Sequence, residues 1–291
     1  MAAQWDELVE AWKLLSPGVV ALAFAFVVLG LFANMLSWRE VLDGLGSPLP
    51  VGAASRVFLL AQLGKYLPGS IWPLVAQTEL ARDHGVARVR SAVGGVVALL
   101  LGLVVGTLVA MGCLLPTEAT EGAWWPWALL LMIPLLVVLH PAVLRRIMLL
   151  LLKVTKQPAT DVTIEAGSLL RAAGWSLLMW AAMGAQVWAL LRDLGGDTSH
   201  PFALGAGAYA AAWVTGFLVV VAPAGAGARE AALVLLLTPA LGSSGALALA
   251  VTSRFLTMAG DGLCALFVVR RGRPQTGRDG AVPGRTATTQ Q

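Results

Sequence analysis

Six ionisable side chains lie within or beside apolar stretches of this 291-residue chain, and these residue types could do chemistry. They are Lys65, Glu79, Arg229, Glu230, Arg254 and Asp261. Three of them, Lys65, Arg229 and Arg254, are cations that could form a pocket for an anion such as a phosphate head group. The alternative is structural, because an ion pair such as Arg254 with Glu230 would hold helices together without a ligand. The two interpretations can share residues, and both stay open here.

Two Pro-Gly interruptions lie close to these side chains. The first is Pro68-Gly69, and the second is the run from Pro223 to Gly227. A helix break leaves backbone N–H and C=O groups unpaired, so inside a membrane it must border protein or water. The N-terminus of a half-helix also attracts anions. The predicted substrate-binding residues are therefore Lys65, Tyr66, Pro68, Gly69, Trp72, Pro223, Gly225, Gly227, Arg229, Glu230 and Arg254.

Other kinds of site have little support in the sequence. Cys113 and Cys264 lie in apolar runs and the three histidines are scattered, so no metal-ligand spacing exists. The turn Gly225-Ala226-Gly227 lacks the rest of a nucleotide-binding motif. An enzyme acting on a lipid phosphate usually needs clustered carboxylates or a histidine base. We therefore expect no catalytic residue, no metal and no cofactor, and we expect that the protein is not an enzyme.

The composition indicates the class of protein to which these residues belong. Hydrophobic residues make up 58% of the chain and charged residues 12%, against about 25% charged residues in soluble domains. The mean hydropathy is +0.78. These values exclude a soluble globular enzyme, a disordered regulator and a fibrous protein, and predict an all-α polytopic membrane protein. Five apolar runs are long enough to span a membrane: residues 17–38, 91–115, 123–140, 169–191 and 245–269.

The two interrupted regions, residues 52–83 and 201–242, are predicted to be re-entrant Pro-Gly hairpins. Each lies between two spans, which predicts two repeats, 17–115 and 169–269, offset by about 154 residues, with a connecting span over 123–156. Residues 17–269 then form one transmembrane domain. If the repeats are inverted, a binding site is expected at their interface near the bilayer midplane.

Charge predicts the orientation of the chain. Basic residues flank 52–83 and follow the runs 123–140 and 245–269, whereas the loops 117–122 and 192–200 are net acidic. The positive-inside rule then places the N-terminus outside and the C-terminus in the cytoplasm of a cell (plasma) membrane protein. The first 16 residues are acidic, so they are predicted to form an interfacial segment and not a signal peptide. Residues 270–291 are predicted to be a disordered cytoplasmic tail.

Two motifs resemble a known family. The stretch from Gly64 to Trp72, followed by His84-Gly85-Val86, is similar to the first signature of the lysylphosphatidylglycerol synthase transmembrane family, the flippase-like integral membrane proteins. The stretch from Ala222 to Glu230, with Arg254 some 24 residues on, is similar to its second signature. The span that follows the first signature lacks the acidic–Arg pair that relatives often carry. An acidic N-terminal segment also stands where many relatives have one more span.

The resemblance implies a bundle that moves lipids or lipid-linked sugars between leaflets. The best-known members carry a soluble aminoacyl-transfer domain, which is not expected here because only about 20 residues follow the last span. The predicted function is a flippase-like lipid translocase that binds an anionic phospholipid or polyprenyl-phosphate head group at the hairpin tips. The alternative is a non-transporting partner or scaffold of a cell-envelope glycosyltransferase or lipid synthase. The expected partner is membrane lipid and not nucleic acid, and the sequence leaves the oligomeric state open.

Overall fold

The fold was analysed in a computed structural model, which describes residues 12–67, 71–115, 117, 164–218 and 225–271. The described part of the chain consists of helices and connecting turns and contains no strand, which confirms the predicted all-α class. Four of its helices are long and apolar enough to cross a membrane: α2 (Pro17–Gly44), α5 (Arg88–Leu114), α8 (Ala166–Asp193) and α10 (Ala228–Arg271). The predicted span 123–140 lies outside the described residues.

Shorter helices lie between these four. The 11-residue α3 (Val51–Ala61) tightens into a 3₁₀ helix, η1 (Gln62–Tyr66), before α4 (Trp72–Arg82). The second short helix, α9 (Pro201–Leu218), precedes α10. α10 bends at Gly242, whose φ of 69° is incompatible with a continuous helix. The bend separates a short helix over 228–241 from a long helix over 243–271, and the long helix contains the predicted apolar run 245–269.

The two long helices α2 and α8 end in the same way. Gly46 and Gly195, with φ of 70° and 74°, follow the helix ends in the left-handed region. The N–H of Gly46 donates to Asp43 O, and the N–H of Ser47 donates to Leu42 O. The same two bonds recur after α8. This Schellman motif satisfies the last carbonyls and turns the chain sharply into the next helix.

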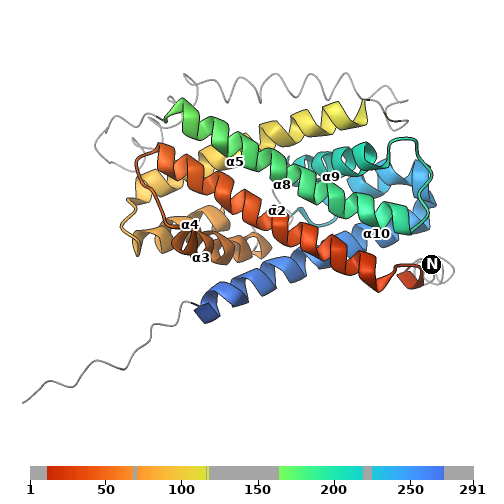
Figure 1. Cartoon of the computed structure of the whole chain (residues 1–291), viewed down its shortest axis with the longest axis horizontal. Coiled ribbons are helices and arrows are strands. Elements are labelled where there is room, and N and C mark those ends of the chain that lie inside the picture. Colours follow the sequence, from red (N-terminus) through yellow and green to blue (C-terminus); the bar gives the residue numbers. More distant parts are fainter. Residues whose placement is uncertain (1–11, 68–70, 116, 118–163, 219–224, 272–291) are drawn as a thin grey trace, which may run out of the picture.

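α2 and α8 pack along their length in opposite directions (Figure 1). At one end the Ser16 hydroxyl donates to Asp193 Oδ1 at 2.9 Å. Toward the other end the Ser37 hydroxyl donates to Ala172 O at 2.8 Å. Between these contacts, Gly30 leaves room for Met183, since a Cβ on Gly30 would lie 2.8 Å from Met183 Cε. The helices that occupy corresponding places in the two halves therefore pack antiparallel.

The described residues form two halves, 12–117 and 164–271. Short helices of each half pack against a long helix of the other half. α3 and η1 contact α10, and α9 contacts α5. Small residues allow the close approach of α9 to α8, because a Cβ on Gly184 would lie 2.6 Å from Ala206 Cα. On α5, Gly106 faces the Trp180 ring, and Gly102 O accepts a hydrogen bond from Trp180 Nε1 at 3.2 Å. These contacts hold the two halves together in one bundle.

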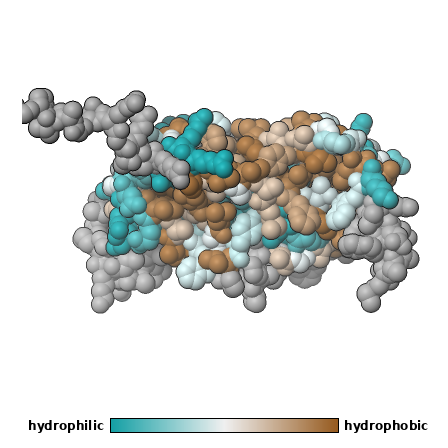
Figure 2. All heavy atoms as spheres, turned by 90° about the horizontal axis from the view of Figure 1, so that it is seen from below, coloured by the Kyte–Doolittle hydropathy of each residue, from teal (hydrophilic) through white to brown (hydrophobic). Residues whose placement is uncertain are grey.

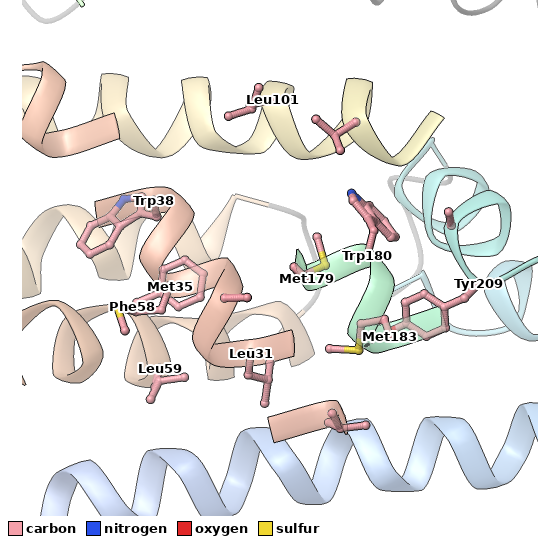
Figure 3. Packing of buried hydrophobic residues seen from close by; sticks show 14 of the residues in the cluster. Leu31, Met35, Trp38, Phe58, Leu59, Leu101, Met179, Trp180, Met183 and Tyr209 are labelled. Atoms are coloured by element: carbon pink, nitrogen blue, oxygen red, sulfur yellow. Dashed lines mark hydrogen bonds between the residues drawn. The ribbon is translucent and has the colours of Figure 1, made fainter. Parts of the chain in front are cut away.

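Buried side chains fill the space between these helices (Figure 3). Trp38 of α2 packs against Phe58 of α3 with ring centroids 5.6 Å apart. Trp180 of α8 packs edge-on against Tyr209 of α9 at 6.3 Å, and the Tyr209 hydroxyl contacts Met183 Sδ at 3.3 Å. α9 is thereby held against α8 just before the second interruption.

α2 extends beyond its apolar run into a stretch that contains charged side chains. The first span was predicted to end at Trp38, but α2 continues to Gly44. Glu40, in this added stretch, pairs with Arg39 at 3.0 Å and with Arg171 of α8 at 2.7 Å, which satisfies its buried carboxylate. Figure 2 shows hydrophobic residues over much of the middle of one face, with hydrophilic residues toward its two ends.

Candidate functional site

The first interruption brings Lys65 and Tyr66 against the middle of α10. Gly64 lies on the start of α4, where a Cβ would be 3.0 Å from the Trp72 carbonyl carbon, so this tight turn needs glycine. Lys65 Nζ lies 2.6 Å from Asp261 Oδ2, and the Tyr66 hydroxyl donates to the same oxygen at 2.6 Å. Two consecutive residues of η1 therefore converge on one carboxylate of α10.

Asp261 is deeply buried. Its side chain is 1% exposed, and in the described part of the chain its Oδ1 accepts no hydrogen bond. The adjacent Gly260 allows α2 to approach closely, since a Cβ there would lie 2.8 Å from Val27 Cγ1. A buried carboxylate requires a cationic partner or a proton, and Lys65 is the cation that the structure supplies.

The second interruption starts α10 with a side-chain cap. The Gly227 N–H donates to Glu230 Oε2 at 2.7 Å, so the third residue of the helix reaches back to its N-cap, as in a capping box. The other oxygen, Glu230 Oε1, lies 3.5 Å from Arg254 Nη1. This is the ion pair that the sequence suggested as the structural alternative. It fastens the start of the short helix to the long helix beyond the Gly242 bend.

Arg229 is placed differently from the other two cations. Its guanidinium carbon lies 4.6 Å from the centroid of the Tyr209 ring, which is a cation–π contact. No carboxylate of the described residues lies within ion-pair distance of it. Tyr209 itself is buried and packs against Trp180. Among the described residues, the aromatic face of Tyr209 is therefore the group that stabilises the charge of Arg229.

These groups form one cluster across the two halves. Arg254 and Asp261 are separated by seven residues of α10, or about 10.5 Å at 1.5 Å per residue. The structure places Lys65 and Tyr66 against Asp261 of α10, the helix that also carries Arg229, Glu230 and Arg254, so these predicted site residues lie on or against one helix. With Asp261, the cluster holds three cations and two carboxylates, a net charge of +1.

The other predicted site residues shape the surroundings or lie elsewhere. Gly225 and Gly227 have φ of 67° and 86°, and a Cβ on Gly225 would lie 2.8 Å from Gly216 O of α9. Both glycines therefore turn the chain, and Gly225 also allows close backbone packing. Trp72 is 43% exposed at the start of α4. Pro68, Gly69 and Pro223 lie outside the described residues.

Asp261 is the site residue that the sequence analysis did not assign. The sequence analysis named it among the six ionisable side chains within or beside apolar stretches, and suggested no partner for it. Its partner Tyr66 is 195 positions away in the chain. The available signal was that Lys65 and Asp261 are opposite charges at membrane depth, each in need of a counter-charge. Glu79, by contrast, lies apart from the cluster, where it is about half exposed and pairs with Arg88 at 3.0 Å.

An apolar groove of about 620 Å³ lies between the first turns of α2 and the middle of α10. It is lined by Trp12, Leu15, Pro17, Val20, Ala21, Phe24, Thr252, Phe255 and Leu256. Trp12 Nε1 donates to Thr252 Oγ1 at 3.1 Å, so the segment that precedes α2 is held against α10. Residues 252–256 flank Arg254, which puts the groove at the same height along α10 as the ion pair with Glu230.

The family model for the lysylphosphatidylglycerol synthase TM region matches residues 1–263. The chain belongs to this family. The matched region of this lysylphosphatidylglycerol synthase TM family member contains both helix interruptions and the whole charged cluster, including Asp261 near its end. Family membership and four long apolar helices make it a multi-pass membrane protein related to lipid synthesis or lipid flipping. No curated protein matches the chain.

Proposed function

We propose that this protein is a lipid translocase that binds an anionic head group between its two helix interruptions. The observation that carries the proposal is that Lys65 and Tyr66, from the first interruption, contact Asp261 of α10, the helix that begins at the second interruption and pairs Glu230 with Arg254. Ionisable groups at this depth in an apolar bundle commonly mark a substrate pathway. Their net charge of +1 suits a phosphate, either of a phospholipid or of a polyprenyl-phosphate lipid.

The proposed topology has five spans and two re-entrant hairpins. α4 has 11 residues and is about 16 Å long, roughly half the hydrocarbon thickness of about 30 Å. α3, η1 and α4 would therefore enter and leave on one side, and α9 with residues 228–241 on the other. The antiparallel packing of α2 and α8 supports an inverted repeat. We place the N-terminus outside and the C-terminus in the cytoplasm of the cell membrane.

Cysteine labelling tests this topology. In a background lacking Cys113 and Cys264, we expect a membrane-impermeant maleimide applied outside cells to label Ser199→Cys and not His84→Cys. Both positions are exposed; His84 lies in the turn between α4 and α5 and Ser199 in the turn between α8 and α9, and these turns lie at opposite ends of the bundle in Figure 1. Permeabilised cells should show labelling of both, which controls for reactivity. Labelling of both from the outside of intact cells would contradict the orientation and the inverted repeat together.

Translocation requires binding and release of the head group, and a route for the acyl chains. Arg229 offers a guanidinium to the phosphate, and Lys65 and Arg254 are neighbouring cations already paired with carboxylates. The apolar groove between α2 and α10 offers a surface of the right chemistry for hydrocarbon. No bond needs to be made or broken in such a cycle, so we propose that the protein is a transporter and not an enzyme.

Arg229→Ala is the sharpest test of the proposed function. Because Arg229 has no carboxylate partner among the described residues, its removal leaves no unpaired buried charge. We expect lipid translocation to fall by about 10- to 100-fold, the value of one charge-assisted hydrogen bond of about 1.5–3 kcal/mol. The assay is dithionite reduction of a fluorescent phosphatidylglycerol in reconstituted vesicles.

Arg192→Ala, an exposed arginine at the end of α8, is the matched control and should transport normally. A second control is the unfolding temperature of Arg229→Ala in detergent, which should stay close to that of the native protein. Unchanged translocation in Arg229→Ala would contradict the proposal and favour the scaffold function.

A further inference from the structure

We propose that Asp261 is a proton-binding site. When a lipid phosphate binds, Lys65 leaves Asp261 to pair with the phosphate, and Asp261 takes up a proton in its place. In the empty site Lys65 pairs with Asp261, as the structure shows. In the loaded site Lys65 pairs with the phosphate, and Asp261 is neutral because it carries a proton. This inference rests on the proposed function and adds to it a co-substrate, the proton, and a residue that holds it.

Among the described residues, Asp261 forms one ion pair, with Lys65, and no second cation contacts it. Oδ2 accepts both the Lys65 and the Tyr66 contacts, each at 2.6 Å, while Oδ1 accepts no hydrogen bond in the described part of the chain. The Asp261 side chain is 1% exposed and that of Lys65 is 30% exposed. An incoming anion can therefore reach the ammonium of Lys65 but cannot reach the carboxylate behind it.

In the part of the chain that the structure describes, few titratable groups face Asp261. Lys65 and Tyr66 come from η1, and Cys264 lies about one turn further along α10 on the same buried side. Arg254 is two turns away and is already 3.5 Å from Glu230. The remaining approach, from α2, is apolar, since Val27 and Leu31 lie against Gly260.

The other helices that contact α10 offer no substitute for Lys65. α9 has no charged residue, and the one charge of α3 is Arg56, which is exposed. The charges of α2 are confined to its last six residues, and those of α8 lie near its two ends. Among the described residues, Lys65 is thus the cation in contact with Asp261.

Movement of Lys65 to a phosphate would leave Asp261 as a buried anion held by one hydroxyl. Such a charge is strongly disfavoured in an apolar interior, so the carboxylate binds a proton from water instead. The Tyr66 hydroxyl can remain hydrogen-bonded to Asp261 in both states, because it can donate to a carboxylate or to a carboxylic acid. The exchange therefore requires one side chain to move and one proton to bind.

The charges balance in both states. The empty cluster has three cations and two carboxylates, a net charge of +1. A singly charged phosphodiester and one proton bind together, so the loaded cluster keeps the charge of +1. A membrane potential does work only on the net charge that is moved. Lipid transport by this site would respond to a pH gradient and would be insensitive to the membrane potential at that step.

Proton uptake on lipid binding is the direct test. Short-chain dioctanoyl phosphatidylglycerol is titrated calorimetrically into the full-length protein in detergent at pH 7, in two buffers that differ in ionisation enthalpy. The difference in heat gives the protons taken up per lipid bound. We expect close to one for the native protein. We expect close to zero for Asp261→Asn, which has no carboxylate, and for Lys65→Met, in which Asp261 already carries its proton before lipid arrives.

Glu79→Gln is the matched control, because it removes a carboxylate that lies apart from the cluster, where it pairs with Arg88, and should keep the native proton uptake. Asp261→Asn and Lys65→Met each remove one partner of the ion pair. The test can therefore be completed with either variant if the other folds poorly. Lipid binding by the native protein without proton uptake would overturn the proton site and leave the proposed function standing. Native uptake in Asp261→Asn would do the same. Absence of lipid binding to the native protein would overturn both.

Discussion

Replacing Lys65 by Met is expected to lower the free energy of unfolding by about 3 kcal/mol, and adding Asp261→Asn to it should restore most of that loss. Breaking a buried ion pair costs about 3–5 kcal/mol because the carboxylate left without its partner must stay buried as a charge or bind a proton, whereas replacing both partners by neutral groups is often close to neutral. The partial exposure of Lys65, at 30% of its side chain, puts the expected loss at the lower limit.

Thermal or denaturant unfolding in detergent measures these free energies. Lys13→Met is the matched control, since Lys13 is exposed and should change stability little. The loss caused by Lys65→Met should shrink as the pH is lowered, because a protonated Asp261 needs no cation. An equal loss in the single and double variants would show that the Lys65 side chain contributes by packing and not by pairing with Asp261.

The helices could be predicted from the sequence because each is marked by its own residues. Apolar runs predicted α2, α5, α8 and the long part of α10 beyond Gly242. The errors are at the boundaries. α2 extends beyond Trp38 because Glu40 finds Arg39 and Arg171 as partners, and a hydropathy pattern contains no information about a partner on another helix.

The site was predictable only where both partners carry a local signal. Glu230 follows a glycine-rich turn and Arg254 interrupts an apolar run, so their pairing could be suggested from the sequence and is present in the structure. The partner of Asp261 could not be suggested, because it depends on how η1 packs onto α10. That packing is decided by tertiary contacts such as those of Gly260 with α2 and Gly64 with α4.

Arg254→Ala should be the second most damaging substitution, with an expected loss of about 2 kcal/mol in the free energy of unfolding and a strong loss of lipid translocation. Its partner Glu230 would be left with the Gly227 N–H as its remaining hydrogen bond. The loss should be smaller than for Lys65→Met, because the Glu230 side chain is 22% exposed and keeps its cap, whereas Asp261 is 1% exposed.

Arg270→Ala, an exposed arginine on the same helix, is the control for Arg254→Ala and should be close to native in both stability and translocation. The double variant Arg254→Met with Glu230→Gln separates the two roles of the pair. Gln can still accept the Gly227 N–H, so the start of α10 should remain capped and stability should recover. Translocation should not recover, because the cluster has then lost one of its three cations. Full transport by the stable double variant would show that Arg254 and Glu230 only fasten the hairpin, and would restrict the head-group site to Lys65, Arg229 and their neighbours.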